Sequence, residues 1–243
     1  RIEDKRVNLM KSITNISGEA VSPVIDGITV YPEAIPAYVY CSQDESGNIA
    51  EDYPEEHTTL VVDLGRFTCD MAIVSTGYQI SGYKTTENGV HKLTDYLLTL
   101  LNRNAISLGL SDTESYSEDQ IKHIINRGYI GSNSEKASAI AARKDVTPLI
   151  TEAKEYLSAI LFADMKELVK DFNMLTRIIF VGGGANWLEE QSSKWFHTVD
   201  IPANPEMAIV RGTYLMLKPK VDGLNAEATA PKKQEETELE EAQ

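Results

Sequence analysis

Residues 58–74 read TTLVVDLGRFTCDMAIV, which is two apolar runs separated by a short turn. The first run, Leu60 to Leu64, is almost continuously apolar, a pattern typical of strands that are covered on both faces. Gly65 breaks this run, and a second β-rich run extends from Thr68 to Val74. The pattern predicts two strands joined by a tight turn, with the first strand in the centre of a sheet.

Farther along the chain, a third β-rich run covers residues 78–84 after a turn at Thr76 and Gly77. Three such runs joined by tight turns predict a meander. Beyond Gly89, apolar residues recur at helical spacing as far as Leu101. A helix buries its apolar stripe against a neighbour, so we expect this helix to cover one face of the sheet.

Helix-start signals follow in the second half of the chain. Ser117 with Gln120 predicts a capping box at the start of one helix. A longer helix is predicted over residues 147–172, because Pro148 suits a first helical turn and apolar residues then recur at helical spacing. Asn204 and Pro205 form a start pair for the last helix. Strands and helices therefore predict an α/β fold.

The composition of the 243 residues is that of an ordinary globular protein with an acidic surface. It is 42% hydrophobic and 25% charged, and 23 Lys and Arg residues against 37 Asp and Glu residues give a formal net charge of −14. The electrostatic field of a protein with this net charge repels phosphate backbones and anionic lipid, which disfavours direct nucleic-acid binding and membrane binding. An anionic ligand would have to be held locally, by backbone amides, a metal ion or a few cations.

The two cysteines, Cys41 and Cys69, have no metal-ligand spacing and suggest reduced thiols, which predicts a cytoplasmic protein. No apolar stretch approaches the roughly 18 to 20 residues that a membrane span needs. The chain begins with Arg1 rather than Met. We therefore expect it to be part of a longer gene product.

The first candidate site is the turn between the first two predicted strands. Asp63 ends a strand predicted to be buried, where a carboxylate needs a metal ion, a hydrogen-bond donor or water. Gly65 removes a side chain where the backbone turns, so that successive N–H groups can point at an anion. The Thr68 hydroxyl can add a donor. An ordinary hairpin with a turn Asp and Gly is the alternative interpretation.

The second candidate site is a glycine run, Gly182, Gly183 and Gly184, between a predicted strand at residues 177–181 and a predicted helix at residues 185–196. The start of a helix presents free N–H groups to a phosphate or a ribose. Glycines also allow a flat base to approach the backbone. The run has neither P-loop nor dinucleotide-binding spacing, so a plain strand-to-helix turn is equally compatible.

The third candidate is Glu33, which stands between Pro32 and Pro36. Two nearby prolines restrict the backbone, and a rigid loop can hold a carboxylate in the direction needed to position a water molecule. A solvated loop glutamate is the alternative.

Taken together and in this order, the motifs resemble the second half of an actin-like ATPase, specifically the plasmid-segregation filament proteins of the ParM/StbA family. The resemblance covers residues 2–217. It is densest in four blocks, Tyr31 to Tyr38, Thr59 to Val74, Ile178 to Ala185 and Asn204 to Leu217.

The resemblance implies an α/β, actin-like (ribonuclease H-like) ATPase lobe with a mixed sheet flanked by helices. Residues 1–30 would then form the end of a first lobe and a linking segment, and residues 31–217 the second lobe. Residues 218–243 lose aromatic and β-branched side chains and are expected to be a disordered acidic tail.

The resemblance also implies that two lobes close over ATP, or GTP, and Mg²⁺. Asp63 would be catalytic and would help to hold the hydrated metal, and Glu33 would orient the attacking water. Gly65, Arg66, Phe67 and Thr68 would form the second phosphate loop. Gly182, Gly183, Gly184 and Ala185 would lie against the nucleoside.

The chain departs from the family pattern in two ways. Arg66 stands where the family has a second glycine, so its side chain would either crowd the phosphates or contact them through its guanidinium. The first half of the family, with its own phosphate loop, is missing, so this chain alone is expected to be inactive.

The implied function is an ATP-driven filament that segregates plasmid DNA. Subunits would self-associate head to tail, and a separate DNA-binding adaptor protein would engage the DNA, in keeping with the acidic surface. The alternatives are another ATPase of the same fold, such as a sugar kinase or an Hsp70-like chaperone, and a non-hydrolysing interaction module.

Overall fold

The computed structural model describes residues 31–44, 46–54, 56–110 and 116–229, with side chains up to residue 223. The chain divides into two compact units, Arg1–Pro32 and Glu33–Gln243, and the fold below is that of the second unit. The residues assigned to the end of a first lobe and a linking segment, 1–30, lie outside the described residues.

A five-stranded mixed sheet forms the centre of the second unit, in the order β3-β2-β1-β6-β7. The first three strands form the predicted antiparallel meander, and β6 pairs in parallel with both β1 and β7. As predicted, β1 is central. The strands are β1 (Thr58–Leu64), β2 (Cys69–Ser75), β3 (Gln79–Thr86), β6 (Arg177–Val181) and β7 (Val199–Asp200).

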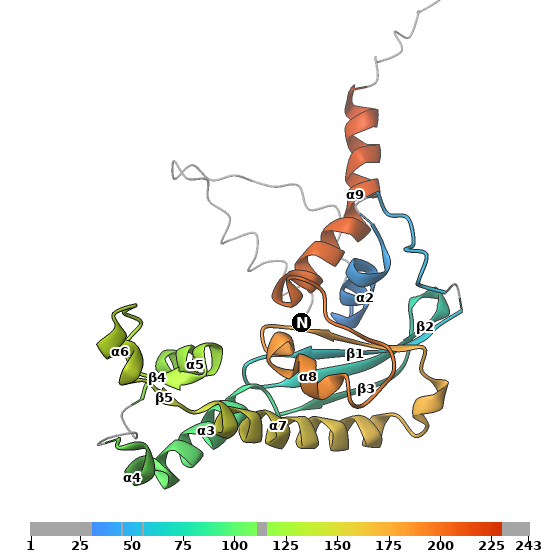
Figure 1. Cartoon of the computed structure of the whole chain (residues 1–243). Coiled ribbons are helices and arrows are strands. Elements are labelled where there is room, and N and C mark those ends of the chain that lie inside the picture. Colours follow the sequence, from blue (N-terminus) through green and yellow to red (C-terminus); the bar gives the residue numbers. More distant parts are fainter. Residues whose placement is uncertain (1–30, 45, 55, 111–115, 230–243) are drawn as a thin grey trace, which may run out of the picture. The chain divides into compact units, whose positions relative to one another are not determined.

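Helices cover both faces of this sheet (Figure 1). On one face lie α3 (His91–Arg103) and α7 (Thr147–Leu168), and on the other lie α2 (Ala34–Ser42) and α9 (Ala208–Thr229). Successive strand residues point to opposite faces, so neighbours in β1 enter different cores. Leu60 and Val62 pack with α3 and α7, whereas Val61 packs with α2 and α9.

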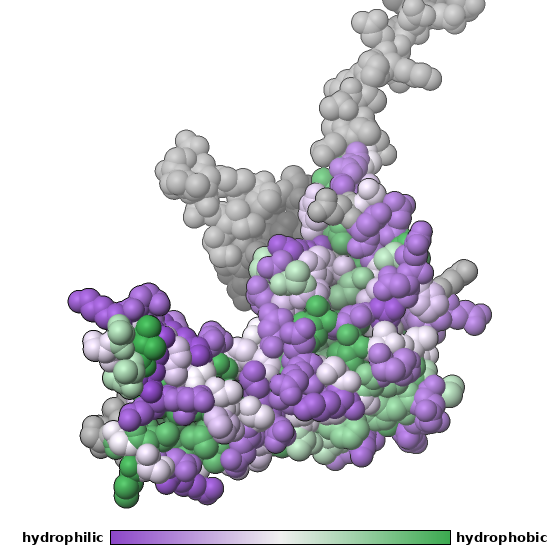
Figure 2. All heavy atoms as spheres, in the orientation of Figure 1, coloured by the Kyte–Doolittle hydropathy of each residue, from purple (hydrophilic) through white to green (hydrophobic). Residues whose placement is uncertain are grey.

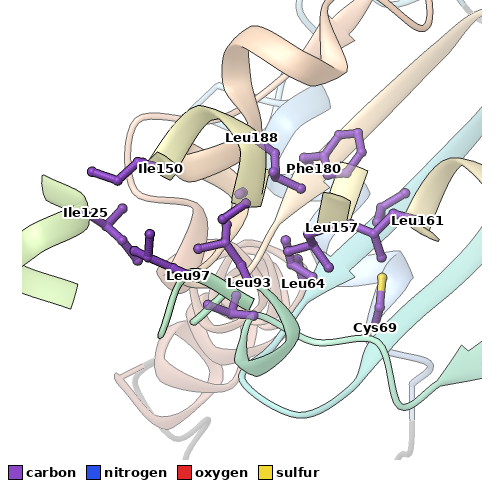
Figure 3. Packing of buried hydrophobic residues seen from close by; sticks show 14 of the residues in the cluster. Leu64, Cys69, Leu93, Leu97, Ile125, Ile150, Leu157, Leu161, Phe180 and Leu188 are labelled. Atoms are coloured by element: carbon purple, nitrogen blue, oxygen red, sulfur yellow. The ribbon is translucent and has the colours of Figure 1, made fainter. Parts of the chain in front are cut away.

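The larger core lies between the sheet and the pair α3 and α7. The predicted stripes of both helices are buried there, as Leu93, Leu97, Leu157 and Leu161 are inaccessible to solvent. They meet Phe180 of β6 and Leu64 of β1 in the cluster that Figure 3 shows. Burying each such side chain stabilises the fold by about 2 kcal/mol, so this face supplies much of the packing.

A backbone contact joins the two helices on the opposite face. A Cβ atom added to Gly212 of α9 would lie less than 3.0 Å from the backbone carbonyl of Pro36 in α2. A side chain at residue 212 would therefore push the two helices apart.

A buried arginine ties β6 to β7. The side chain of Arg177 is only 7% exposed and forms an ion pair with Asp200. The guanidinium lies 3.7 Å from the ring centroid of Tyr53, whose hydroxyl donates a hydrogen bond of 2.8 Å to Asp200. Asp52 accepts a further hydrogen bond from Arg177 through its backbone carbonyl, at 2.6 Å. The buried charge is thus fully partnered.

A small subdomain, residues 105–110 and 116–145, extends beyond the end of α3 (Figure 1). The predicted capping box is confirmed: the Ser117 side chain accepts from the Gln120 N–H, and the Gln120 side chain accepts from the Ser117 N–H. The subdomain contains α4 (Ala105–Leu108), α5 (Glu118–Arg127), β4 (Tyr129–Ile130), α6 (Ala137–Ala141) and β5 (Lys144–Asp145).

Two segments differ from the sequence prediction. The single helix predicted over residues 185–196 is broken into a 3-10 helix (Ala185–Leu188) and the one-turn helix α8 (Glu189–Ser192). The last helix continues to Thr229, although disorder was predicted from residue 218. Its Leu, Lys and Ala residues have high helix propensity, and the helix continues through Pro219. Residues 230–243 lie outside the described part of the chain.

On the face that Figure 2 shows, hydrophilic residues are widespread and hydrophobic residues are interspersed among them. No helix among the described residues is long and apolar enough to cross a membrane. Cys41 and Cys69 are free cysteines, as predicted.

Candidate functional site

The two motifs that lie farthest apart in the sequence meet at one edge of the sheet. Strands β1 and β6 are parallel, and Asp63 is in register with Val181, so both strands end at the same edge. A Cβ atom at residue 182 would lie less than 3.0 Å from Asp63 Oδ1, and the Gly184 N–H donates a hydrogen bond of 3.2 Å to the Leu64 carbonyl. The Asp63 turn and the glycine run are therefore direct neighbours.

The Asp63 carboxylate is held in an unfavourable environment for its charge. Its pKa is raised from 3.8 to about 6, chiefly by burial and additionally by the negative charges of Glu33 and Asp70. Among the described residues it has no hydrogen-bond or ion-pair partner. A cation or a hydrogen-bond donor placed beside Asp63 would stabilise its charged form and lower its pKa again.

The turn that follows Asp63 is fixed by the start of α3. The N–H groups of Val90 and His91 donate to the carbonyls of Gly65 and Arg66, at 3.0 and 2.9 Å. Within the turn, the Gly65 N–H donates to the Thr68 carbonyl at 3.0 Å. The carbonyl groups of the turn are thus held by hydrogen bonds from the start of α3 and from within the turn.

The remaining N–H groups of the turn are available. In the described part of the chain, the N–H groups of Arg66, Phe67 and Thr68 have no hydrogen-bond partner. Consecutive free N–H groups at a turn form a concave site that suits an anion. Phosphate binding by this turn stays a prediction.

Sequence reasoning missed the residues that support this turn from behind. A Cβ atom on Gly89 would lie 2.5 Å from the Arg66 carbonyl oxygen, so only glycine fits beneath the turn. The preceding residue, Asn88, donates a hydrogen bond of 2.6 Å to Asp164 of α7, and Asp164 also pairs with Lys84 at 2.8 Å. The one sequence signal that could have pointed to this support was Gly89, a glycine directly before a predicted helix.

The hydroxyl of Thr68 already has a partner. It donates to Asp70 Oδ2 at 3.3 Å, and Thr85 donates to the other oxygen of Asp70 at 2.6 Å. Thr68 can still offer its backbone N–H to a ligand.

Arg66 and Phe67 form the exposed tip of the turn. The Arg66 guanidinium lies 4.6 Å from the ring centroid of Phe67 and forms an ion pair with Glu118, the first residue of α5. The Phe67 ring also lies 5.6 Å from that of His91. The side chain that departs from the family pattern is thus directed toward the small subdomain.

The three glycines of the run have three different structural roles. Gly182 has φ +85° and lies against Asp63, so its backbone conformation and its neighbour both require glycine. Gly184 is buried, and a Cβ atom there would collide with Val90 and Leu64. Gly183 is exposed with open space around its Cβ position, which makes it the position where a flat ligand could approach the backbone. Ala185 is fully buried beneath them.

The loop predicted around Glu33 is wrong. Glu33 has helical dihedral angles, φ −58° and ψ −27°, and is the N-cap of α2. Pro36 lies in the first turn of this helix, where a missing N–H costs nothing because that group would lack an intrahelical partner. The Glu33 side chain makes no capping hydrogen bond and is exposed. Its negative charge contributes to the raised pKa of Asp63.

The described residues contain no group of three or more His, Cys, Asp or Glu side chains that could hold a metal ion by themselves. Mg²⁺ differs from most metals here, since it is often bound by one or two carboxylates together with phosphates and water. The single carboxylate of Asp63, beside a turn with three free N–H groups, fits that mode.

No protein-family model and no curated protein sequence matches this chain. Solved structures do match, although at low sequence identity. A ParM described as the pCBH non-polymerisable quadruple mutant is 17% identical with a TM-score of 0.64, covering 90% of this chain and 65% of its own. A 15-stranded ParM filament from Clostridium botulinum is 16% identical with a TM-score of 0.62, over 90% and 63%.

A third similar structure is MreB 5 of Spiroplasma citri bound to AMPPNP, at 14% identity and a TM-score of 0.53, over 80% of this chain and 60% of its own. The described part of the chain therefore has an actin-like fold of the ParM type, as the sequence resemblance implied. The chain spans less than two thirds of the length of each of these structures.

Proposed function

We propose that this chain is the second lobe of an actin-like, filament-forming ATPase of the cytoplasm that segregates plasmid DNA. One observation carries the proposal: the Asp63 turn and the glycine run, separated by more than a hundred residues of sequence, lie side by side at the ends of two parallel strands. An AMPPNP-bound actin-like structure with the same fold supports a nucleotide as the ligand.

Each part of the site has a separate task in this proposal. The free N–H groups of residues 66–68 bind phosphate oxygens, and Gly183 lies against the nucleoside. Asp63 accepts hydrogen bonds from the water shell of Mg²⁺. Bound Mg-ATP, or Mg-GTP, supplies the phosphoryl group and the metal charge for hydrolysis.

Glu33 is proposed to accept a hydrogen bond from the attacking water. It is exposed at the start of α2 and close enough to Asp63 to affect its pKa. An exposed carboxylate can hold a water molecule and orient its lone pair without losing its own charge. Catalysis in this arrangement comes mainly from positioning and electrostatics.

Self-association into filaments is supported by the fold shared with a ParM filament structure. Head-to-tail contacts extend a filament because each subunit presents two different surfaces. The net charge of −14 makes the protein a poor ligand for DNA, so a DNA-binding adaptor protein is proposed as the partner that joins filament to plasmid.

The test is polymerisation of the protein at its natural length, followed by light scattering at micromolar concentration and by electron microscopy. Addition of Mg-ATP is expected to raise the scattering, and phosphate release should follow. Asp63→Ala should remove hydrolysis, whereas Asp95→Ala, on the exposed side of α3, should not. Nucleotide binding without turnover would favour the non-hydrolysing module, and no binding at all would overturn the proposal.

A further inference from the structure

Arg66 links the candidate phosphate turn to the small subdomain. Its guanidinium forms an ion pair with Glu118, which is the first residue of α5. The Arg66 side chain is 58% exposed, so water screens this pair. Exposed ion pairs are weak and exchange partners easily. A more highly charged anion could therefore replace Glu118 as the partner of Arg66.

Such an anion would bind within reach of the same side chain. A phosphate held by the N–H groups of Arg66, Phe67 and Thr68 would lie next to the Arg66 backbone. The guanidinium presents parallel N–H donors that match two phosphate oxygens. A triphosphate carries more negative charge than a single carboxylate, so Coulomb attraction favours the phosphate.

Glu118 keeps a partner if Arg66 leaves. Its second carboxylate oxygen lies 2.9 Å from Lys122 Nζ, one helical turn along α5. The carboxylate also lies at the N-terminus of α5, where the helix dipole favours negative charge. Exchange therefore leaves Glu118 with a partner.

We propose that Arg66 exchanges its partner when nucleotide binds, from Glu118 in the empty site to a phosphate in the loaded site. This inference rests on the proposed nucleotide function. Glu118 competes with the phosphate for one guanidinium, so loading the site releases the start of α5 from the turn. Arg66 thereby makes the position of the small subdomain depend on the occupancy of the site.

A second contact to α5 supplies a natural reporter. Trp187 Nε1 donates a hydrogen bond of 3.1 Å to Asn126 of α5, and the Trp187 N–H donates to Gly184 of the glycine run. The indole thus touches α5 from the other side of the candidate site. Trp187 and Trp195 are the two tryptophans of the sequence, so Trp195→Phe leaves a single emitter.

The test is a double-mutant cycle, measured by calorimetric titration of Mg-ATP into the protein at its natural length. Glu118→Gln is expected to tighten binding about threefold, and Arg66→Gly to weaken it about tenfold. In the Arg66→Gly background, Glu118→Gln should change nothing. Asp119→Asn, on the same helical turn without contact to Arg66, is the matched control.

The outcomes separate the two proposals. If wild type binds Mg-ATP but Glu118→Gln leaves the affinity unchanged or weaker, partner exchange is overturned and the nucleotide function stands. If wild type binds no Mg-ATP, both are overturned. Should Arg66→Gly fail to fold, Arg66→Lys serves instead. Lysine keeps the positive charge but lacks the paired N–H donors of the guanidinium, so this variant should lose part of the affinity for Mg-ATP.

Fluorescence gives a readout that a purely structural role of Arg66 would not change. In a Trp195→Phe protein, Mg-ATP is expected to alter the emission of Trp187, and the change should vanish with Arg66→Gly even at saturating nucleotide. A change that persists in that variant would mean that α5 responds by another route, and would overturn the proposed coupling.

Discussion

Asp63, in β1, and Gly182, directly after the parallel strand β6, lie side by side, so closely that residue 182 has no room for a Cβ atom. The contact fixes where the Asp63 carboxylate points, because Asp63 Oδ1 packs against the Gly182 backbone. The same residue has φ +85°, a conformation that side chains disfavour. The glycine is thus required twice, by its own backbone and by its neighbour.

Gly182→Ala is therefore expected to lower the free energy of unfolding by about 2 kcal/mol and to displace Asp63. Urea denaturation followed by tryptophan fluorescence measures the first effect. The control is Gly183→Ala, since its Cβ would point into open space. Equal losses for the two variants would show that the contact with Asp63 carries no special cost.

The stability of the protein should fall as the pH rises through the titration of Asp63. Its pKa in the folded state, about 6, exceeds the ordinary value of 3.8, so the folded protein binds the extra proton between these values. The favourable contribution is complete below about pH 4 and is lost through pH 6. Allowing for partial access of water, the change is about 2 kcal/mol.

Asp63→Asn should remove this pH dependence and make the protein more stable at pH 7, while abolishing hydrolysis. Urea denaturation at pH 4.5 and pH 7.5 checks the stability. Asp95→Asn is the control, because Asp95 is exposed on α3. A wild-type protein whose unfolding free energy rises across this window would show that the Asp63 environment has been misjudged.

Gly212→Ala should separate α2 from α9, because its Cβ would overlap the Pro36 carbonyl. We expect a loss of about 3 kcal/mol in unfolding free energy. Gly223→Ala, in the same helix with no atom within 4 Å of its Cβ, should instead stabilise by about 0.5 to 1 kcal/mol. Thermal unfolding followed by circular dichroism compares the two, and equal effects would refute the close crossing.

The ion pair of Arg177 predicts that substitutions of two aspartates, Asp200 and Asp52, lower the free energy of unfolding by different amounts. Asp200→Asn leaves the buried guanidinium without its main partner and should cost about 3 kcal/mol. Asp52→Asn should cost less than about 1 kcal/mol, because that side chain is 73% exposed and lies 3.7 Å away. Chemical denaturation measures both. Similar losses of unfolding free energy for the two variants would mean that both carboxylates neutralise the charge of Arg177 to the same extent.

The central part of the fold follows from local patterns in the sequence. The meander over residues 58–86 and the long helix from Thr147 were predicted because apolar periodicity and turn residues agree there. The capping box at Ser117 was predicted for the same reason, as its signal is contained within four residues. Elements with local signals were placed correctly.

Elements whose form depends on packing were not predicted correctly. The helix α2 was missed because Pro36 signals a loop, and only the contact with α9 shows why a helix forms there. The break at residue 189 likewise lacks a local signal. The extension of α9 to Thr229 was missed for another reason: its residues have high helix propensity, but the loss of aromatic and β-branched residues beyond Lys218 favoured disorder. Propensity is a weak prior that tertiary contacts override.

The candidate site shows the same division. The motifs around Asp63 and Gly182 were recognised, and the parallel pairing of β1 with β6 brings them together. The supports at Gly89 and Asp164 and the ion pair of Arg66 with Glu118 join residues distant in sequence, which no short motif reveals. Roles for nucleotide and metal remain proposals.

The close crossing at Gly212 also has a mechanical consequence. Pro36 lies one helical turn after Glu33, and the Ala37 N–H holds the Glu33 carbonyl at 3.2 Å. A displacement of the last helix toward α2 would therefore pass from main chain to main chain, as far as the backbone of the residue that caps α2. The N-cap of α2 and the last helix would then move as one piece.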